Sequence, residues 1–196
     1  ACIARLAQNP KLKGLRPMLQ DIADRHWIGN PALAPAIEAM LAHQLSFDAL
    51  VLPHHLEPLL NFAQRYPTLP IVIDHAAKPL IADALIEPWL TQMKKLAALP
   101  QVHCKLSGML TEAGSNPSAE TVQPYVDAIL KAFGPERLMW GSDWPVLRLA
   151  GDYGAWLGMC RTFLAQLSPL QQEAVLGGNA TRFYRLNVPL RSAAQE

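Results

Sequence analysis

The sequence has few of the features that mark secreted, membrane-spanning or nucleic-acid-binding proteins. Its 196 residues include three cysteines, Cys2, Cys104 and Cys160, and this odd number at wide spacing favours neither a disulfide framework nor a zinc knuckle. No apolar run approaches the roughly 18 residues that a membrane-spanning helix needs. The formal net charge of +1 gives no reason to expect nucleic acid or an anionic membrane as a partner. We therefore expect a protein of the reducing cytoplasm.

The sequence also contains no Gly-x-Gly-x-x-Gly segment after any predicted strand, which argues against a dinucleotide-binding domain. Half of the residues are hydrophobic (51%) and 17% are charged, which is typical of a folded globular chain and not of a disordered one. The length suits one sizeable core and is short for two. We predict a single domain over residues 1–196.

Five short apolar segments alternate with helical patterns along the chain. The predicted strands are 12–15, 47–52, 71–74, 102–106 and 138–140. Between them, apolar residues recur at helical spacing, and proline or glycine marks most of the predicted helix boundaries. Near the end, Gly177-Gly178 is predicted to stop one helix, and Asn179 is predicted to cap a last one.

Alternation of strands and helices predicts an α/β fold with a parallel sheet covered by helices. Two architectures fit this pattern, a doubly wound open sheet and a (β/α)₈ TIM barrel. A barrel takes around 250 residues. Five units that begin within a helix (residues 1–7) predict the last five βα units of a barrel, strands 4–8, without its first three units.

Polar residues follow each predicted strand, and parallel strands would bring them to one edge of the sheet. A cation, an imidazole and a carboxylate placed together suit hydrolysis of a carbonyl compound, and histidine with aspartate also suits a metal site. The residues at these positions are Arg16, His54, His55, Asp74, His75, Lys105, Ser107 and Asp143.

Each position also has a structural interpretation. Asp143 lies between Ser142 and Trp144, where aspartate often serves as a turn residue. Arg16 can be a surface ion-pairing residue, and the pair His54 and His55 is expected to be exposed at a helix start. If Lys105 faces inward, we expect it to be a paired lysine of the barrel. If it faces outward, we expect its side chain to extend to the surface. Trp144 and Trp27 can pack or stack on a sugar, and we favour a functional role only for Trp144.

Five segments in this order resemble motifs of the lactonase branch of the amidohydrolase superfamily. That branch holds sugar-lactone hydrolases acting on L-fuconolactone or L-rhamnonolactone, and the pyrone-dicarboxylate lactonase. The resemblance extends over nearly the whole chain. The segments are Gly14–Asp21, Ile73–Pro79, Cys104–Gly108, Trp140–Pro145 and Leu176–Tyr184.

The resemblance implies a (β/α)₈ barrel with its site at the carboxyl ends of the strands. It implies that Asp143 closes the eighth strand as the catalytic acid/base. It also implies that His75 is an active-site histidine on the sixth strand and that Arg16, at the end of the fourth, contacts the substrate. Trp144, beside Asp143, is expected to contact the substrate as well.

One part of the family pattern is missing. The family's first strand carries a His-x-His pair, and this sequence has none. We therefore expect a fragment or a truncated barrel, and expect these 196 residues alone to express poorly or associate. Without that pair, and because this branch is similar to enzymes that do not all need a metal, we predict that no cofactor is required. A divalent metal such as zinc, if bound, would be held by His75 and Asp143.

The sequence thus predicts that the intact protein hydrolyses a lactone, and the favoured substrate is the lactone of a six-carbon sugar acid. Asp143 would activate water, His75 would polarise the carbonyl oxygen, and Arg16 would orient the substrate. Three alternatives remain open from the sequence. They are a metal-dependent amidohydrolase or decarboxylase, a doubly wound binding domain without catalysis, and an inactive truncated barrel.

Overall fold

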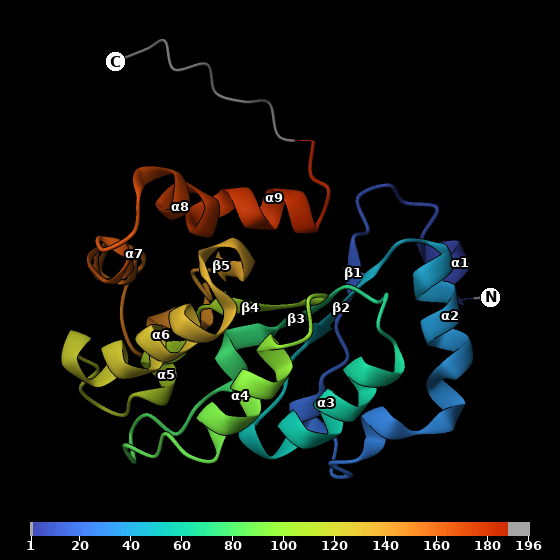
Figure 1. Ribbon diagram of the computed structural model, residues 1–196, viewed down its shortest axis with the longest axis horizontal. Coiled ribbons are helices and arrows are strands. Elements are labelled where there is room, and N and C mark those ends of the chain that lie inside the picture. The colour runs from blue at the N-terminus through green and yellow to red at the C-terminus, as the bar shows by residue number, and fades with distance from the viewer. Residues whose placement is uncertain (1, 188–196) are drawn as a thin grey trace.

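The computed structural model describes residues 2–187 and contains one sheet of five parallel strands. Each strand pairs with the next along the chain, in the order β1-β2-β3-β4-β5 (Figure 1). A doubly wound sheet reverses its strand order, whereas the wall of a barrel does not. The order therefore favours the predicted barrel. The strands are β1 (Gly14–Leu15), β2 (Ser46–Ala49), β3 (Ile71–Ile73), β4 (Val102–Leu106) and β5 (Leu138–Trp140).

All five predicted strands are present, and three of them are shorter than predicted or shifted. The first covers only the end of 12–15, and the second begins one residue before 47–52 and ends three residues earlier. The third ends at Ile73, because Asp74 already belongs to the turn that follows.

Helices lie on both sides of the sheet. Figure 1 shows α3, α4 and α6 along one face and α8 and α9 on the opposite side. Within residues 2–187, no helix is long and apolar enough to cross a membrane. The helices are α1 (Cys2–Leu6), α2 (Ala34–Ala42), α3 (Leu56–Arg65), α4 (Trp89–Ala97), α5 (Met109–Glu112), α6 (Ala119–Phe133), α7 (Tyr153–Leu164), α8 (Pro169–Glu173) and α9 (Asn179–Phe183).

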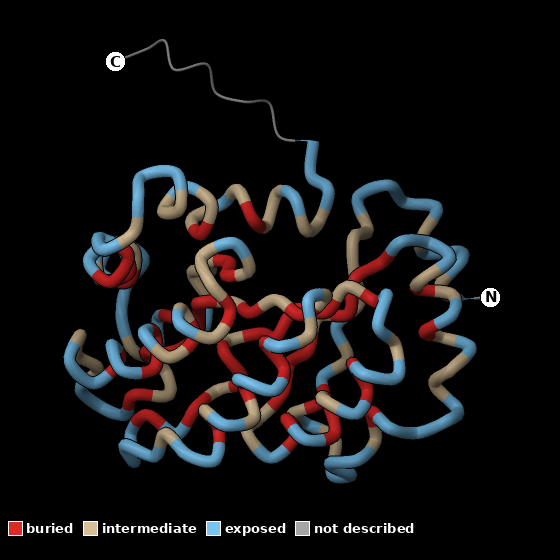
Figure 2. The backbone as a smooth tube through the Cα atoms, viewed as in Figure 1, coloured by how far each residue is buried: buried red, intermediate tan, exposed pale blue. Residues whose placement is uncertain are grey.

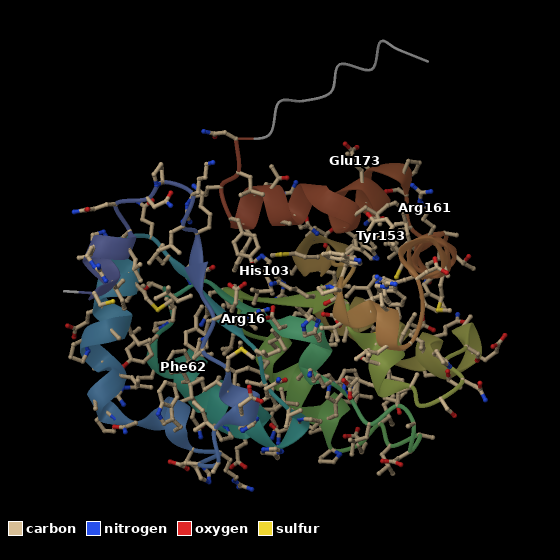
Figure 3. The ribbon with its side chains drawn as sticks, turned by 180° about the vertical axis from the view of Figure 1, so that it is seen from behind. Arg16, Phe62, His103, Tyr153, Arg161 and Glu173 are labelled. Atoms are coloured by element: carbon tan, nitrogen blue, oxygen red, sulfur yellow. The ribbon has the colours of Figure 1, made fainter. Side chains whose placement is uncertain are left out.

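The hydrophobic core lies between the sheet and α3, α4 and α6, where the buried residues gather in Figure 2. On β2, Phe47 points to this side, and its ring centroid lies 4.9 Å from that of Phe62 on α3. Phe62 is labelled in Figure 3. The register pairs Phe47 with Ile71, and Ile73 with Cys104, so these side chains share the core face. The alternate residues of the same strands lie on the opposite face, and two of them, Asp48 and Lys105, are charged. On this face the His103 ring lies 4.7 Å from that of Phe183 on α9.

Helix α9 begins differently from the prediction. Gly177-Gly178 does not stop the preceding helix, because a π-helical turn over Ala174–Gly178 joins α8 to α9. Asn179 does not cap α9 with its side chain. Its Nδ2 instead donates to the carbonyl oxygens of Pro135 (2.7 Å) and Leu138 (2.6 Å), at the amino end of β5. This contact fixes α9 against the strand that leads to Asp143.

We expect Asn179→Ala to lower the free energy of unfolding by about 2–3 kcal/mol, because two carbonyl groups near the core would lose their donor. Asn179 is 2% exposed, so water does not readily replace it. Urea unfolding of the variant measures the loss. Asn61→Ala, on the exposed side of α3, is the matched control. Equal stability of the two variants would contradict the assigned role of Asn179.

Candidate active site at the carboxyl edge of the sheet

A left-handed turn follows β3 and carries His75. Four consecutive residues, His75–Lys78, have positive φ angles between 48° and 60°, although none is glycine. This conformation costs roughly 1–2 kcal/mol per residue and persists only where the surrounding structure holds it. The buried indole of Trp89 on α4 donates to the Ala76 carbonyl at 2.7 Å, and Lys78 N–H donates to His75 O at 2.8 Å. Strain of this kind collects at functional sites.

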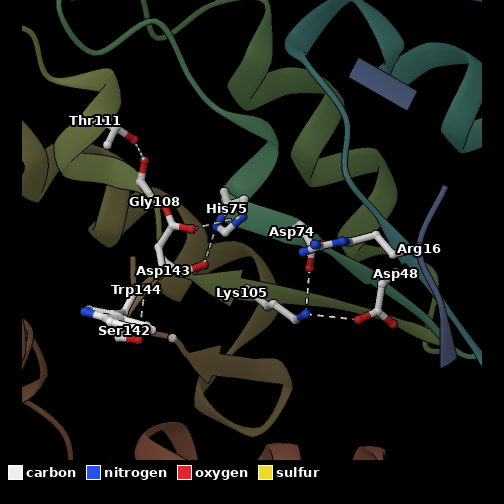
Figure 4. Close-up of polar contacts among 12 residues, drawn as sticks. Arg16, Asp48, Asp74, His75, Lys105, Gly108, Thr111, Ser142, Asp143 and Trp144 are labelled. Carbon is white, nitrogen blue, oxygen red and sulfur yellow. Dashed lines mark hydrogen bonds and ion pairs between the residues drawn. The ribbon is translucent and has the colours of Figure 1, made fainter. Parts of the chain in front are cut away.

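The turn brings His75 beside Asp143. The imidazole Nε2 lies 3.6 Å from Asp143 Oδ1, and each side chain is 14% exposed (Figure 4). Asp143 also has a positive φ angle of 57°, just after β5. On its other side, His75 Nδ1 lies 2.9 Å from the hydroxyl oxygen of Ser107, which follows β4. Three adjacent strands thus contribute one polar group each to a single cluster.

The histidine of this cluster is held neutral at pH 7. Burial lowers the pKa of His75 below its usual value of 6.5, although the carboxylates of Asp143 and Asp74 oppose the shift. A neutral imidazole has one nitrogen that donates and one that accepts. If the Ser107 hydroxyl donates to Nδ1, Nε2 carries the proton and presents it toward Asp143 and the open side of the cluster.

Gly108 makes room for this arrangement. It has a φ of 66°, and a Cβ atom placed on it would lie 2.7 Å from Cβ and Cγ of His75. No side chain fits at that distance without moving the histidine. Gly108 lies in the segment Cys104–Gly108, which resembles a motif of the family. Its contact with His75 could not be derived from the sequence, because that contact depends on how two loops meet.

A second polar cluster lies beside the first (Figure 4). Arg16 Nη1 lies 3.7 Å from Asp74 Oδ2, and Lys105 Nζ lies 2.7 Å from Asp74 Oδ1. Lys105 also donates to Asp48 Oδ2 at 3.0 Å, and the Tyr184 hydroxyl donates to the same oxygen at 2.5 Å. Lys105 is therefore the inward-facing, paired lysine that the sequence left as one of two possibilities.

The electrostatics of Lys105 follow from these contacts. Burial opposes its charge, but the carboxylates of Asp74 and Asp48 outweigh that effect and raise the pKa of the ammonium group. Burial and Asp48 likewise raise the pKa of the Tyr184 hydroxyl, which stays protonated. Asp48 and Tyr184 were not predicted as site residues. Strand alternation could have placed Asp48 on the same face as Lys105, whereas no local signal identifies Tyr184, which lies 136 residues away.

The sequence pattern of the Amidohydrolase family matches residues 1–186. The chain belongs to this family. An L-fucono-1,5-lactonase from Burkholderia ambifaria is 58% identical over 96% of this chain and 67% of its own length. A second L-fucono-1,5-lactonase, from Burkholderia multivorans, is 37% identical over 91% of this chain and 64% of its length. The chain thus spans about two thirds of these curated relatives.

Among solved structures, an amidohydrolase from Burkholderia multivorans with bound zinc superimposes with a TM-score of 0.89. It is 36% identical, and the match covers 94% of this chain and 69% of that one. Together with the strand order, this similarity confirms the predicted partial TIM barrel. Because that relative contains zinc, the expectation that no cofactor is required is not supported.

The described residues provide an incomplete metal site. His75 Nε2 and Asp143 Oδ1 are donors of the type that zinc prefers, and 3.6 Å is a separation at which two donors can share one ion. A catalytic zinc site normally uses three protein ligands. Over residues 2–187, no group of three or more His, Cys, Asp or Glu side chains could hold a metal ion. The pair can therefore serve only as part of a ligand set.

The remaining predicted residues have different placements. Trp144 is 65% exposed, and its backbone N–H donates to the Ser142 hydroxyl oxygen at 3.2 Å. The predicted exposure of His55 is wrong, because it is 4% exposed and its Nδ1 accepts from Leu52 N–H at 3.1 Å. His55 thus has a structural role at the helix start. Trp27 packs against the core.

Proposed function

We propose that the protein containing this chain hydrolyses a sugar lactone, L-fucono-1,5-lactone or a closely related aldonolactone. The observation that carries the proposal is the His75–Asp143 pair, 3.6 Å apart at the carboxyl edge of the sheet, in a chain 58% identical to an L-fucono-1,5-lactonase. Chemistry in barrels of this type is placed at that edge. A small-molecule lactone is the partner that this site would take.

In the proposed mechanism, Asp143 acts first as a base and then as an acid. Its carboxylate takes a proton from water as the water oxygen bonds to the lactone carbonyl carbon. The carbonyl oxygen becomes negative, and a neutral His75 with a proton on Nε2 donates a hydrogen bond to it. As the bond from that carbon to the ring oxygen breaks, protonated Asp143 returns its proton to the ring oxygen. The product is the open hydroxy acid.

Two further residues would bind the substrate. The Arg16 guanidinium is at the carboxyl end of β1 with its side chain half exposed, so it can donate to substrate hydroxyls or to the carboxylate that forms. Trp144 is exposed next to Asp143 and offers an aromatic surface to the apolar face of a sugar ring. We also propose that residues 1–196 form a single domain, and that the protein is cytoplasmic.

The test is a rate assay with the natural protein and purified L-fucono-1,5-lactone, followed by acid release at constant pH. The proposal expects saturable hydrolysis above the spontaneous rate. An aldonolactone of the opposite configuration at the ring hydroxyls is the matched comparison. Hydrolysis of neither lactone would overturn the proposed function.

A metal-dependent hydrolase is the second candidate, because a zinc-containing relative shares this fold at 36% identity. A bound ion would act as a Lewis acid on the substrate carbonyl, with His75 and Asp143 among its ligands. In that case Ser107 would accept from Nδ1–H, which leaves the Nε2 lone pair of His75 free for the ion.

Elemental analysis of the natural protein before and after a chelator separates the two candidates. The metal-dependent form predicts about one equivalent of zinc in the natural protein. It also predicts that both the zinc and the activity are lost in His75→Ala and after treatment with the chelator. Full activity in metal-free protein favours the metal-independent form. Asp127→Asn, an exposed change on α6, controls for nonspecific loss of metal.

A further inference from the structure

The second polar cluster contains two carboxylates, Asp74 and Asp48, and two cations, Arg16 and Lys105. Asp74 is fully buried, and its Oδ1 has the Lys105 ammonium at 2.7 Å. Its Oδ2 has Arg16 at 3.7 Å, a distance beyond that of a hydrogen bond. Lys105 is thus the close counter-ion of Asp74, and Arg16 is a loose one.

Lys105 is itself held from the other side. Asp48 accepts a hydrogen bond from the Lys105 ammonium at 3.0 Å, and Ser46 and Tyr184 donate to Asp48 at 3.0 Å and 2.5 Å. The Lys105 ammonium also lies 5.6 Å from the centre of the Tyr184 ring. These contacts come from β2 and from the end of α9, so the position of Lys105 is determined by two elements that take no part in the proposed reaction.

The Arg16 side chain is less constrained by its neighbours than that of Lys105. Its side chain is 50% exposed, whereas that of Lys105 is 22% exposed. A buried carboxylate without a close counter-ion would attract any nearby guanidinium into a two-bond ion pair, because that geometry is the strongest available to it. Arg16 is the nearby guanidinium. Its present looseness therefore depends on Lys105.

We propose that Lys105 is a positioning residue that neutralises Asp74 and thereby leaves the Arg16 guanidinium free to bind the substrate. It acts through Asp74 and touches no reacting atom. The role of Arg16 toward a lactone rests on the proposed function, whereas the competition between Lys105 and Arg16 for Asp74 does not. If Lys105 only stabilised the fold, its replacement would not change the reactivity of the Arg16 guanidinium.

The experiment follows the reactivity of Arg16 in the natural protein with phenylglyoxal, a dicarbonyl reagent for free guanidinium groups. The rate is measured by mass spectrometry on the peptide that contains Arg16. In Lys105→Met we expect at least about threefold slower modification, because Arg16 closes onto Asp74. Lys105→Arg, which keeps the charge, should recover a large part of the rate. Another exposed arginine, Arg161 on α7, is the internal control.

A double variant tests the same competition with less risk to folding. Asp74→Asn with Lys105→Met removes both charges, and replacement of a buried ion pair as a whole is tolerated better than loss of one partner. Arg16 should then react at about the natural rate or faster. Unchanged Arg16 reactivity in folded Lys105→Met would overturn the proposal. If that variant does not fold, slow modification in the double variant would overturn it.

A kinetic readout adds a test that depends on the lactonase function. Loss of a binding group that acts equally on substrate and transition state raises KM and leaves kcat unchanged. We expect Lys105→Met to raise KM for the lactone about tenfold, with kcat within a factor of about three. If no lactone is hydrolysed, the proposed function fails, and the phenylglyoxal rates still decide the role of Lys105. A fall in kcat alone would contradict the proposal.

Discussion

Gly108→Ala is expected to reduce lactone hydrolysis at least about tenfold, since displacing a catalytic group by 1 Å can cost about a hundredfold. The new Cβ would lie 2.7 Å from His75 Cβ and Cγ, so the imidazole must move away from its place between Ser107 and Asp143. The change also forces alanine into a φ of 66°, which costs roughly 1–2 kcal/mol of stability. Steady-state kinetics and urea unfolding measure the two effects separately.

Gly114→Ala separates strain from displacement. Gly114 has a φ of 81°, so alanine is strained there too. The nearest atom to the added Cβ, however, is the Cβ of Ala82 at 3.4 Å, which is an ordinary contact. We expect a similar loss of stability with nearly natural activity. Equal activities of the Gly108 and Gly114 variants would show that the position of His75 does not matter for turnover.

Asp143→Asn is expected to lower kcat for the lactone by at least about a hundredfold, the usual scale for loss of a general acid/base. The amide is close in size to the carboxylate but cannot accept a proton from water. It also cannot return one to the ring oxygen. Asp127→Asn, exposed on α6, is the matched control and should keep its activity. Steady-state rates of the two variants give the comparison.

The sequence predicted the fold well because its signals are local. Apolar segments of three to six residues, with proline or glycine near the helix boundaries, locate all five strands. Their parallel order follows from the helices between them. The start of α9 was predicted less well. Asn179 has the residue type of a helix cap, but two carbonyl groups at the amino end of β5 bind its side chain instead.

The candidate site was predicted in its parts and not in its contacts. The rule that polar residues after parallel strands converge brought His75 and Asp143 together, as the 3.6 Å separation shows. Arg16 was placed at the same edge, but its ion pair with Asp74 and the counter-ion role of Lys105 need the register of four strands. The left-handed turn that carries His75 has no glycine and was invisible in the sequence.

The most direct test of the central claim is the initial rate of acid release from L-fucono-1,5-lactone at pH 7, measured with the natural protein and with its Asp143→Asn variant. Both rates are corrected for spontaneous ring opening. We predict saturable catalysis by the natural protein and a rate at least about a hundredfold lower for the variant. Equal rates for the two proteins, or no rate above the spontaneous one for either, would contradict a lactonase site built on Asp143.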